Sequence, residues 1–356
     1  MLHTLRAAVD RCGYLDLISA FTTDPDPGKM RDFIDTEVGP DLADAVRLFH
    51  LADPVSSEAA DRLTGGLCSQ LTQAGLFQLN DGQVRTKNLK LRFVDGLVFF
   101  TGAPSARFPL YFGDDSLGLL RRQRIRQGER GLDLCTGTGV QALKLALAGG
   151  VVTGVDINPF AIQVARLNAE FNGVSAKVEF RRGDLWAGLK DGERFDWICA
   201  NPPMVPALPG GLYPLVGDGG DDGLEITWRF LAGLPGALAE NGQAITLGVA
   251  WSDGVLPQCL DRMRIVADEQ DLNIRMTITR TLDARPGSGW YEALKQTYLG
   301  ATAMDEAQVT QALGEQLDRN QATHSVMYFL NVTRASRGSL TLADLSPFRS
   351  QRLWDI

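Results

Sequence analysis

The feature that most constrains the fold of this chain is an alternation of strand-like and helix-like segments between Arg130 and Gly248. Short apolar runs typical of buried strands alternate there with longer runs of helical period. We expect strands over residues 131–135, 151–155, 177–180, 197–200 and 244–248. Alternating units of this kind build a doubly wound parallel sheet, so the pattern predicts an α/β, Rossmann-like fold.

Two later segments, 273–281 and 325–332, are rich in Val, Ile, Thr, Tyr and Phe and are expected to close the sheet at seven strands. A helix is expected between them, over 305–317. If the first of these strands is parallel to the others, it ends at the carboxyl edge, where open α/β sheets bind ligands. The insertion 282–324 is therefore expected to act as a lid over a site.

The N-terminal part, residues 1–105, is expected to form a separate helical domain, followed by the sheet domain over 106–356. Its second half predicts a helix, a turn, a helix and then a hairpin around Asp81, an order similar to a winged helix. A DNA-binding winged helix needs cationic side chains on its second helix, yet no Lys or Arg occurs between Arg62 and Arg85. We therefore favour dimerisation or substrate capping over DNA binding.

Composition excludes several classes of protein. The chain has 356 residues, of which 44% are hydrophobic and 22% charged, which is a globular rather than a disordered profile. Its formal net charge of -8 argues against general nucleic-acid binding. The five cysteines are scattered and the three histidines stand outside any ligand motif, so no metal site is expected. Without an apolar span or a signal-peptide core, a cytoplasmic location and no membrane partner are expected.

A glycine-rich turn follows the first expected strand in the segment GLDLCTGTGVQALKLALA. Gly137 and Gly139 permit tight backbone conformations and close approach of a ligand to the main chain. By itself the turn is weak evidence: it is compatible with a structural role or with dinucleotide binding, although the third glycine of the dinucleotide-binding pattern is missing.

Two acidic residues follow the next expected strands. Asp156, in VVTGVDIN, ends the second strand, where a carboxylate can accept hydrogen bonds from both ribose hydroxyls. Asp184 and Leu185, in RRGDLW, follow the third strand and are candidates for the adenine amine and the adenine face. A polar residue between strand and loop is the alternative for Asp184.

The segment FDWICANPPMVP places Asn201, Pro202, Pro203 and Met204 after the fourth expected strand. The prolines restrict the backbone and predict a rigid turn. The Asn201 side-chain oxygen and the Pro202 carbonyl can then accept two hydrogen bonds from one NH2 group and direct its lone pair at an electrophilic methyl.

With these motifs in order, DLCTGTG, VDIN, GDLW and NPPM, the chain resembles class I S-adenosylmethionine-dependent methyltransferases of the NPPY group, and among them the HemK-like family that methylates glutamine in release factors. The later GDGGDDGLE resembles the family's glycine-rich segment after the NPP turn. The resemblance implies S-adenosyl-L-methionine as cofactor and direct methyl transfer. It also implies cofactor contacts from the following residues: Tyr111, Asp133, Thr136, Gly137, Gly139, Asp156, Ile157, Asp184, Leu185 and Asn201.

Met204 departs from the family, which usually has Tyr or Phe at this position to stack on a planar acceptor. Met supplies no ring face, so we expect an amine, amide or guanidino nitrogen of a small polar molecule as the acceptor. Asp221 and Asp222 are candidates to hold a cationic acceptor, although an acidic helix N-terminus is the favoured explanation for them. Trp290 and Tyr291 are candidates to line the pocket, with buried anchors as the alternative.

Three other functions remain open. The acceptor is alternatively a glutamine in a protein, which makes a protein partner the second choice. An enzyme that transfers or cyclises the aminocarboxypropyl arm of the cofactor is a further alternative. A regulator that binds nucleic acid and only senses S-adenosylmethionine is the non-enzyme alternative, disfavoured by the intact NPPM. The chain is also a candidate homodimer.

Overall fold

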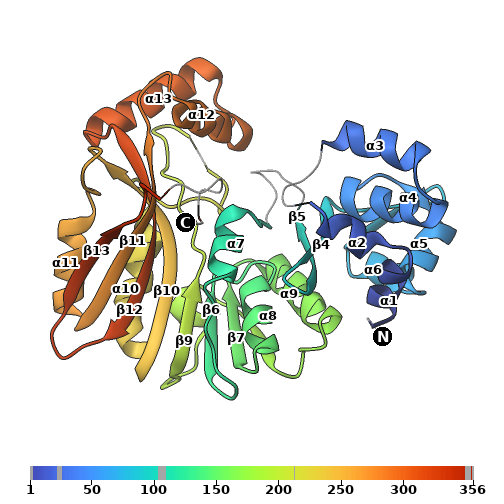
Figure 1. Ribbon diagram of the computed structural model, residues 1–356, viewed down its shortest axis with the longest axis horizontal. Helices are drawn as coiled ribbons and strands as arrows, with labels where there is room; N and C mark the ends of the chain where they lie inside the picture. Colours follow the sequence, from blue (N-terminus) through green and yellow to red (C-terminus); the bar gives the residue numbers. More distant parts are fainter. Residues whose placement is uncertain (1–2, 22–25, 103–109, 212, 349–353, 355–356) are drawn as a thin grey trace. The chain divides into compact units, whose positions relative to one another are not determined.

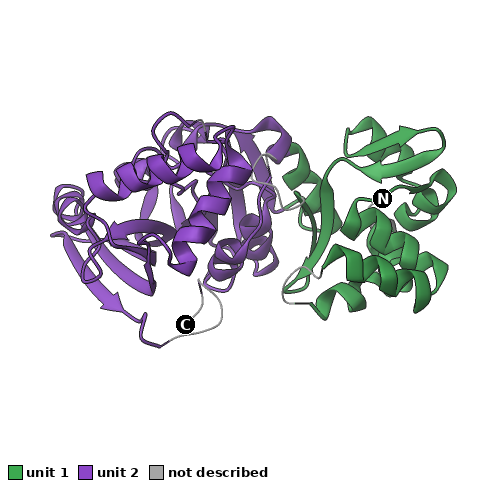
Figure 2. Ribbon diagram, turned by 90° about the horizontal axis from the view of Figure 1, so that it is seen from above, with its two compact units in different colours: residues 1–103, 163–176 green, residues 104–162, 177–356 purple. Residues whose placement is uncertain are grey.

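The computed structural model describes residues 3–21, 26–102, 110–211, 213–348 and 354. The chain divides into two compact units, residues 1–103 with 163–176 and residues 104–162 with 177–356 (Figure 2). The domain boundary expected at 105/106 lies outside the described residues and stays a prediction. One helix, α9 (Pro159–Phe171), contributes residues to both units.

The first unit contains short helices and two small antiparallel sheets. Its helices are α1 (His3–Arg11), α2 (Tyr14–Ser19), α3 (Pro27–Thr36), α4 (Pro40–Val46), a π-helical turn η1 (Arg47–Leu51), α5 (Ser57–Thr64) and α6 (Cys68–Gln73). Its strands are β1 (Val55–Ser56), β2 (Phe77–Asn80), β3 (Gln83–Thr86), β4 (Leu89–Val94) and β5 (Leu97–Gly102).

The segment α5–α6–β2–β3 has the helix, turn, helix and hairpin that the sequence predicts. The Ser56 hydroxyl accepts a hydrogen bond from the Ala59 N–H at 3.1 Å and so caps α5. Asp81 and Gly82, both at positive φ, make the tight turn between β2 and β3. β1 completes the small sheet in the order β1-β3-β2. A winged-helix role in dimerisation or capping stays a prediction.

Two asparagine side chains on α9 form hydrogen bonds with the backbone of β5, as a neighbouring strand would. The Asn168 side chain accepts a hydrogen bond from the Phe100 N–H at 2.8 Å and donates to the Phe100 carbonyl at 2.9 Å. Asn172, one turn later, makes the same pair of bonds with Val98. β5 pairs with β4, and these side chains satisfy backbone groups of Val98 and Phe100 in this buried, hydrophobic strand.

We expect Asn168→Ala to lower the free energy of unfolding of the first unit by about 2–4 kcal/mol, because a buried N–H and a buried C=O both lose their partners. Urea unfolding of the full chain measures this. Asn172→Ala serves as the comparison and should cost less, because Asn172 is only partly buried and water can replace its bonds. Equal and small effects of the two variants would contradict the proposed bonding.

The second unit is built on one large sheet. Its strands are β6 (Arg130–Leu134), β7 (Val151–Asp156), β8 (Val178–Arg182), β9 (Phe195–Ala200), β10 (Leu238–Ser252), β11 (Leu272–Asp283), β12 (His324–Arg334) and β13 (Ser339–Asp344). Its helices, besides the start of α9, are α7 (Asp114–Leu120), α8 (Val140–Leu147), α10 (Glu225–Ala237), α11 (Leu260–Glu269), α12 (Gly289–Ala301), α13 (Glu306–Arg319) and the 3-10 turn η2 (Leu185–Gly188).

The strand order is β13-β11-β12-β10-β9-β6-β7-β8, with β12 antiparallel to both of its neighbours (Figure 1). The expected doubly wound α/β sheet is therefore confirmed, but with eight strands among the described residues. The sequence prediction of seven missed β13, whose residues are mostly exposed and lack the apolar run of a buried strand. β11 and β10 are both antiparallel to β12 and so run in the same direction, which meets the condition for the insertion after β11 to start at the carboxyl edge of the sheet.

The strand order also predicts where the ligand crevice of the sheet lies. From β6 the chain moves outward through β7 and β8, whereas β9 returns to the other side of β6 and leads to β10. Right-handed crossovers then put α8 and α10 on opposite faces of the sheet. The crevice of such a sheet lies at the carboxyl ends of the strands where the order reverses, here between β6 and β9.

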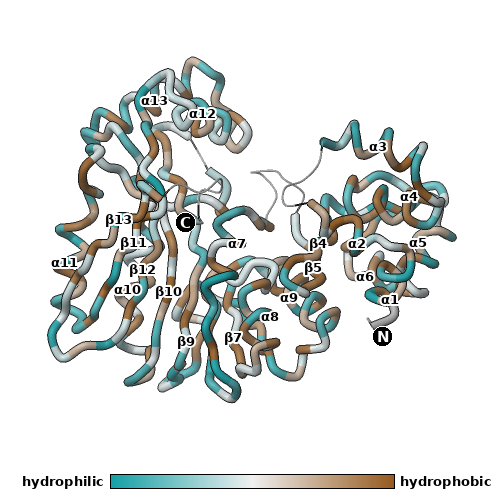
Figure 3. The backbone as a smooth tube through the Cα atoms, in the orientation of Figure 1, coloured by the Kyte–Doolittle hydropathy of each residue, from teal (hydrophilic) through white to brown (hydrophobic). Residues whose placement is uncertain are grey.

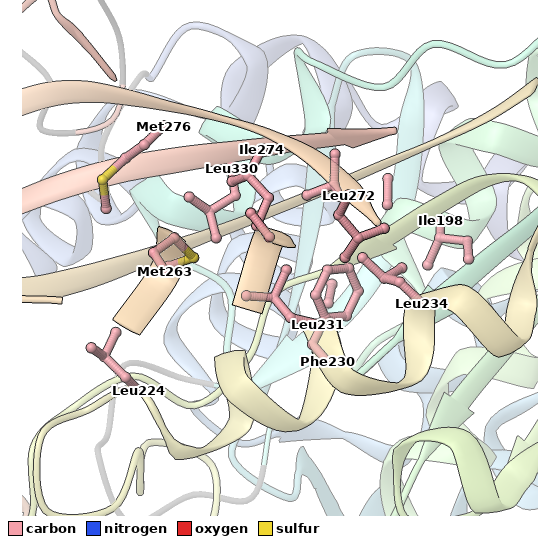
Figure 4. Close-up of a cluster of buried hydrophobic side chains, with 14 of the residues drawn as sticks. Ile198, Leu224, Phe230, Leu231, Leu234, Met263, Leu272, Ile274, Met276 and Leu330 are labelled. Atoms are coloured by element: carbon pink, nitrogen blue, oxygen red, sulfur yellow. The ribbon is translucent and has the colours of Figure 1, made fainter. Parts of the chain in front are cut away.

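A hydrophobic cluster fills the space between the sheet and α10 and α11. Phe230, Leu231 and Leu234 of α10 point at side chains of the strands, among them Ile198 and Leu272 (Figure 4). All five are buried, and their contact holds the strand ends in fixed positions. Hydrophobic residues recur along the strands, and hydrophilic residues occupy turns between the elements (Figure 3). Among the described residues, no helix is long and apolar enough to cross a membrane.

Candidate active site

The glycine-rich turn after β6 is held in place by Asp133, a completely buried carboxylate. Its Oδ2 atom accepts hydrogen bonds from the Thr136 hydroxyl at 2.5 Å and from the Ala142 N–H at 3.1 Å. Burial raises the pKa of Asp133 to about 7, although these two hydrogen bonds favour its charged form. The observed partners of Asp133 are thus the turn, the start of α8 and the Cys199 thiol on β9, and the predicted cofactor contacts of Asp133 and Thr136 stay predictions.

The turn is coupled directly to Asp156 at the end of β7. The Gly137 N–H donates to Asp156 Oδ2 at 2.8 Å, and the Asn158 N–H donates to Oδ1 at 2.9 Å. Gly137 and Gly139 have φ of 53° and 81°, a region that favours glycine. Among the described residues, a Cβ on Gly137 would meet one atom within 4 Å, the Cys135 carbonyl oxygen at 3.9 Å. The turn therefore leaves open space beside a partly buried carboxylate, as the sugar and tail of a nucleoside cofactor require.

Two non-glycine residues near this turn have positive φ, a backbone conformation that side chains with a Cβ rarely adopt. Cys135 has φ 56° and Leu185, after β8, has φ 48°. Such conformations cost of order 1–3 kcal/mol each and persist where surrounding structure imposes them, often at functional sites. Desolvation by burial raises the pKa of the Cys135 thiol, which is therefore a neutral packing group.

The residues predicted for adenine lie at the neighbouring strand ends. Ile157 is 44% exposed and Leu185 is buried. Asp184 Oδ2 accepts a hydrogen bond from Arg229 on α10 at 2.7 Å, so this side chain has a salt-bridge partner that the sequence analysis did not foresee. Among the described residues, the second carboxylate oxygen of Asp184 accepts no hydrogen bond, which leaves an acceptor for an adenine amine.

Asn201 follows β9 and lies at the centre of a partly buried hydrogen-bond network. Its Nδ2 donates to Asp115 Oδ2 at 2.9 Å and to the Ser116 hydroxyl at 3.0 Å. The Tyr111 hydroxyl donates to the other oxygen of Asp115 at 2.8 Å. Burial raises the pKa of Asp115. Both amide protons of Asn201 are thereby used, and its Oδ1 is the atom left to accept.

The remaining motif residues start a loop that is paired with the glycine-rich segment before α10. The Val205 N–H donates to the Gly217 carbonyl, and the Gly219 N–H donates back to the Val205 carbonyl. Gly223, at φ 78°, lies so close to the Met204 carbonyl that a Cβ would come within 2.7 Å of its oxygen. Pro202 is buried, whereas Pro203 and Met204 are partly exposed. This packing fixes the Met204 backbone while leaving its side chain accessible.

The acidic loop residues are engaged in local structure. Asp222 Oδ1 accepts from the Leu224 N–H at the start of α10, and the Asp221 carbonyl accepts from Gln316 on α13. Asp221 keeps an exposed carboxylate. Contact of either residue with an acceptor stays a prediction.

The insertion between β11 and β12 consists of α12, which the sequence analysis missed, and α13, which it predicted. Tyr291 is 3% exposed and packs with Leu208, Trp251 and Tyr298, and Trp290 packs against this cluster. The Tyr298 hydroxyl donates to the Pro206 carbonyl at 2.8 Å. Both predicted aromatic residues are thus anchors of the insertion, and the insertion is bonded to the loop that follows the motif.

Asp115 and Ser116 are functional candidates that the sequence analysis missed. They lie far from Asn201 in the sequence, and nothing in YFGDDSLG distinguishes Asp115 from the exposed Asp114. One feature of the sequence could have indicated them: two acidic residues and a serine begin a helix just before the glycine-rich turn.

Comparisons with known proteins concern the segment that contains this site. Residues 116–267 match the model of the methyltransferase small domain. This segment is therefore similar to methyltransferase domains. The chain is 39% identical over 127 residues to the ribosomal protein uL3 glutamine methyltransferase of Bradyrhizobium diazoefficiens, which covers 33% of this chain and 40% of that protein. It is 38% identical over 159 residues to the release factor glutamine methyltransferase of Moorella thermoacetica, covering 37% of this chain and 56% of that protein.

Among solved structures, a putative transferase from Pyrococcus horikoshii aligns over 87% of this chain and all of that chain, with 10% identity and a TM-score of 0.44. The predicted similarity to HemK-like glutamine methyltransferases is confirmed by the sequence relatives, which are named as methyltransferases. The chain spans only about half the length of these relatives. The expected preference for a small polar acceptor finds no support in them.

Proposed function

We propose that this protein is an S-adenosylmethionine-dependent methyltransferase that transfers a methyl group to the side-chain amide nitrogen of a glutamine in a protein. The observation that carries the proposal is the orientation of Asn201. Asp115 and Ser116 take both of its amide protons, so Oδ1 is left to accept, and the carbonyl of the next residue, Pro202, is the second acceptor in the proposal. Two neighbouring acceptors are complementary to an NH2 group.

The relatives support glutamine as the acceptor, because two of them are named for its methylation in a ribosomal protein and in a release factor. We extend the proposal to a cytoplasmic location on the same ground. Asp156 and the turn at Gly137 and Gly139 would hold the cofactor, which supplies an electrophilic methyl on sulfur.

This chain's residues would act by alignment. An amide nitrogen is a weak nucleophile because its lone pair is shared with the carbonyl group. Two accepted hydrogen bonds hold the NH2 group in place and raise the electron density on nitrogen. A new N–C bond forms as the S–C bond breaks, and the nitrogen then releases one proton to water. Positioning of this kind supplies a large share of the rate without an acid or base in contact with the nitrogen.

The test uses S-adenosylmethionine carrying a labelled methyl group, incubated with the purified protein and a cell extract that is then separated into proteins and small molecules. We expect label in a protein band and a mass increase of one methyl group on glutamine in its peptides. Label confined to small molecules would refute the protein acceptor and favour the small polar acceptor, for which Met204 is the relevant feature. Cofactor consumption without methyl transfer would point to chemistry on the aminocarboxypropyl arm.

A further inference from the structure

The start of α7 lies directly against the amide of Asn201. Asp115 is 5% exposed and Ser116 is 3% exposed, and each accepts one proton of Asn201 Nδ2. These residues come from a segment about 85 positions before Asn201, so only the folded chain brings them together. An asparagine amide has nearly the same shape when its oxygen and nitrogen exchange places. The ionised Asp115 carboxylate can only accept and therefore decides between these orientations, whereas the Ser116 hydroxyl can accept or donate and adds a second bond in the orientation that Asp115 selects.

The two acceptors are themselves held in place from several directions. The Tyr111 hydroxyl donates to Asp115, and a Cβ on Gly113 would lie 2.0 Å from that hydroxyl, so Tyr111 can reach Asp115 only across a glycine. The Gly113 N–H donates to the Ser116 hydroxyl at 3.3 Å. The Gln141 side chain on α8 donates to the Ser116 carbonyl at 2.8 Å.

Further hydrogen bonds connect α8 to the sheet, and a packing contact joins α7 to Trp354. Gln123 donates to Gln141, and the Trp197 indole on β9 donates to Gln123 at 2.7 Å. On the other side of α7, Gly118 lies against Trp354, where a Cβ would come within 2.8 Å of the Trp354 Cβ. The position of α7 is therefore set by α8, by β9 and by a buried tryptophan.

We propose that Asp115 and Ser116 are positioning residues that set the orientation of the Asn201 amide, so that Oδ1 and not the NH2 group faces the methyl acceptor. The inference rests on the proposed function for its catalytic consequence. In the reversed orientation, the Asn201 NH2 group would face the NH2 group of the acceptor, and two donors repel. Loss of Asp115 therefore lowers the fraction of molecules able to align the acceptor, while the cofactor contacts on β6 and β7 are unchanged.

The experiment compares Asp115→Leu, Asp115→Asn and Ser116→Ala, with Asp114→Leu as the matched control. Asp114 is the exposed acidic neighbour on the same helix turn. We expect Asp115→Leu to lower kcat about 100-fold, with the dissociation constant of S-adenosylmethionine within about threefold of the parent value. Asp115→Asn keeps a carbonyl oxygen for Asn201 Nδ2, and its own amide can donate to the Tyr111 oxygen. It should therefore recover kcat to within about fivefold, and Asp114→Leu should match the parent.

A second readout does not depend on turnover. The Nδ2 protons of Asn201 should give a distinct pair of signals in a nitrogen–proton correlation spectrum, assigned by their absence in Asn201→Ala. We expect slow solvent exchange of these protons in the parent protein and in Asp115→Asn, and exchange at least 10-fold faster in Asp115→Leu. Ser116→Ala, a smaller change, should give an intermediate rate, which keeps the test valid if Asp115→Leu fails to fold.

Equal exchange rates in the parent, Asp115→Leu and Ser116→Ala would overturn the inference, as would a low kcat in Asp115→Asn matching that of Asp115→Leu. The two proposals fail separately. If no glutamine is methylated but the exchange rates change as expected, the orientation of Asn201 stands and the proposed acceptor is wrong.

Discussion

Replacing Asn201 by alanine is expected to lower kcat about 10²- to 10³-fold while changing the dissociation constant of S-adenosylmethionine no more than about threefold. Removing one fixed hydrogen-bonding group from the transition state typically has an effect of this size. The cofactor contacts expected from Gly137 and Asp156 come from other strand ends and are joined to each other rather than to Asn201. The loss should therefore fall on the transfer step.

Single-turnover rates with bound cofactor measure the transfer step, and titration calorimetry measures the cofactor affinity. Asn331→Ala is a suitable control, because Asn331 is an exposed asparagine on β12 of the same unit. A parallel loss of turnover and cofactor affinity in Asn201→Ala would contradict the assignment, since it would make Asn201 a cofactor ligand in the first place. An unchanged rate would remove Asn201 from the mechanism.

Replacing Asp133 by asparagine is expected to make the stability of the protein less dependent on pH. The pKa of Asp133 is raised to about 7 in the folded protein by burial, above the value near 4 of an unfolded chain. Between these values the folded state holds a proton that the unfolded state has released. The free energy of unfolding therefore falls as pH rises from about 4 to about 7, and stays low above that range.

In Asp133→Asn the carboxyl group is replaced by an amide, which does not titrate in this pH range. Its carbonyl oxygen can still accept from the Thr136 hydroxyl and the Ala142 N–H, and its NH2 group would face the Cys199 sulfur, which lies 3.6 Å from the other oxygen of Asp133. The stability of Asp133→Asn relative to the parent should then increase by about 2–3 kcal/mol between pH 5 and pH 8.

Urea unfolding of both proteins at several pH values measures this difference, and the other titrating groups cancel because both proteins contain them. Asp191→Asn, at an exposed position in the turn before β9, should show no such trend. A difference that is constant with pH would mean that Asp133 is charged in the folded state throughout this range. In that case the negative charge of Asp133 would stabilise the glycine-rich turn instead of destabilising the folded protein.

The strands were the most predictable part of the structure. The seven strands expected in the second unit are all present, because buried parallel strands require continuous apolar runs that stand out in the sequence. β13 was missed because an exposed edge strand needs no such run. In the insertion, α13 begins with the acidic cap of Asp305 and was predicted, whereas α12 follows a proline- and glycine-containing turn and was not.

The aromatic residues of the insertion show a further limit. Trp290 and Tyr291 were candidates to line a pocket, yet they pack into the cluster that contains Tyr298 and Leu208. An aromatic side chain that lines a site and one that anchors a helix have the same chemistry, and only their neighbours distinguish them. Those neighbours come from β10, from the loop after the motif and from α13.

The sequence by itself determined the fold class and the motif residues, because hydrophobic periodicity and short turns with glycine and proline are local properties. Tertiary structure alone decided how these residues act. Asp133 supports the glycine turn from the core, Asp184 has a partner on α10, and Asn201 is oriented by Asp115 and Ser116 from α7. Hydrogen bonds between distant segments depend on how strands and helices pack, and a local sequence pattern does not specify that packing.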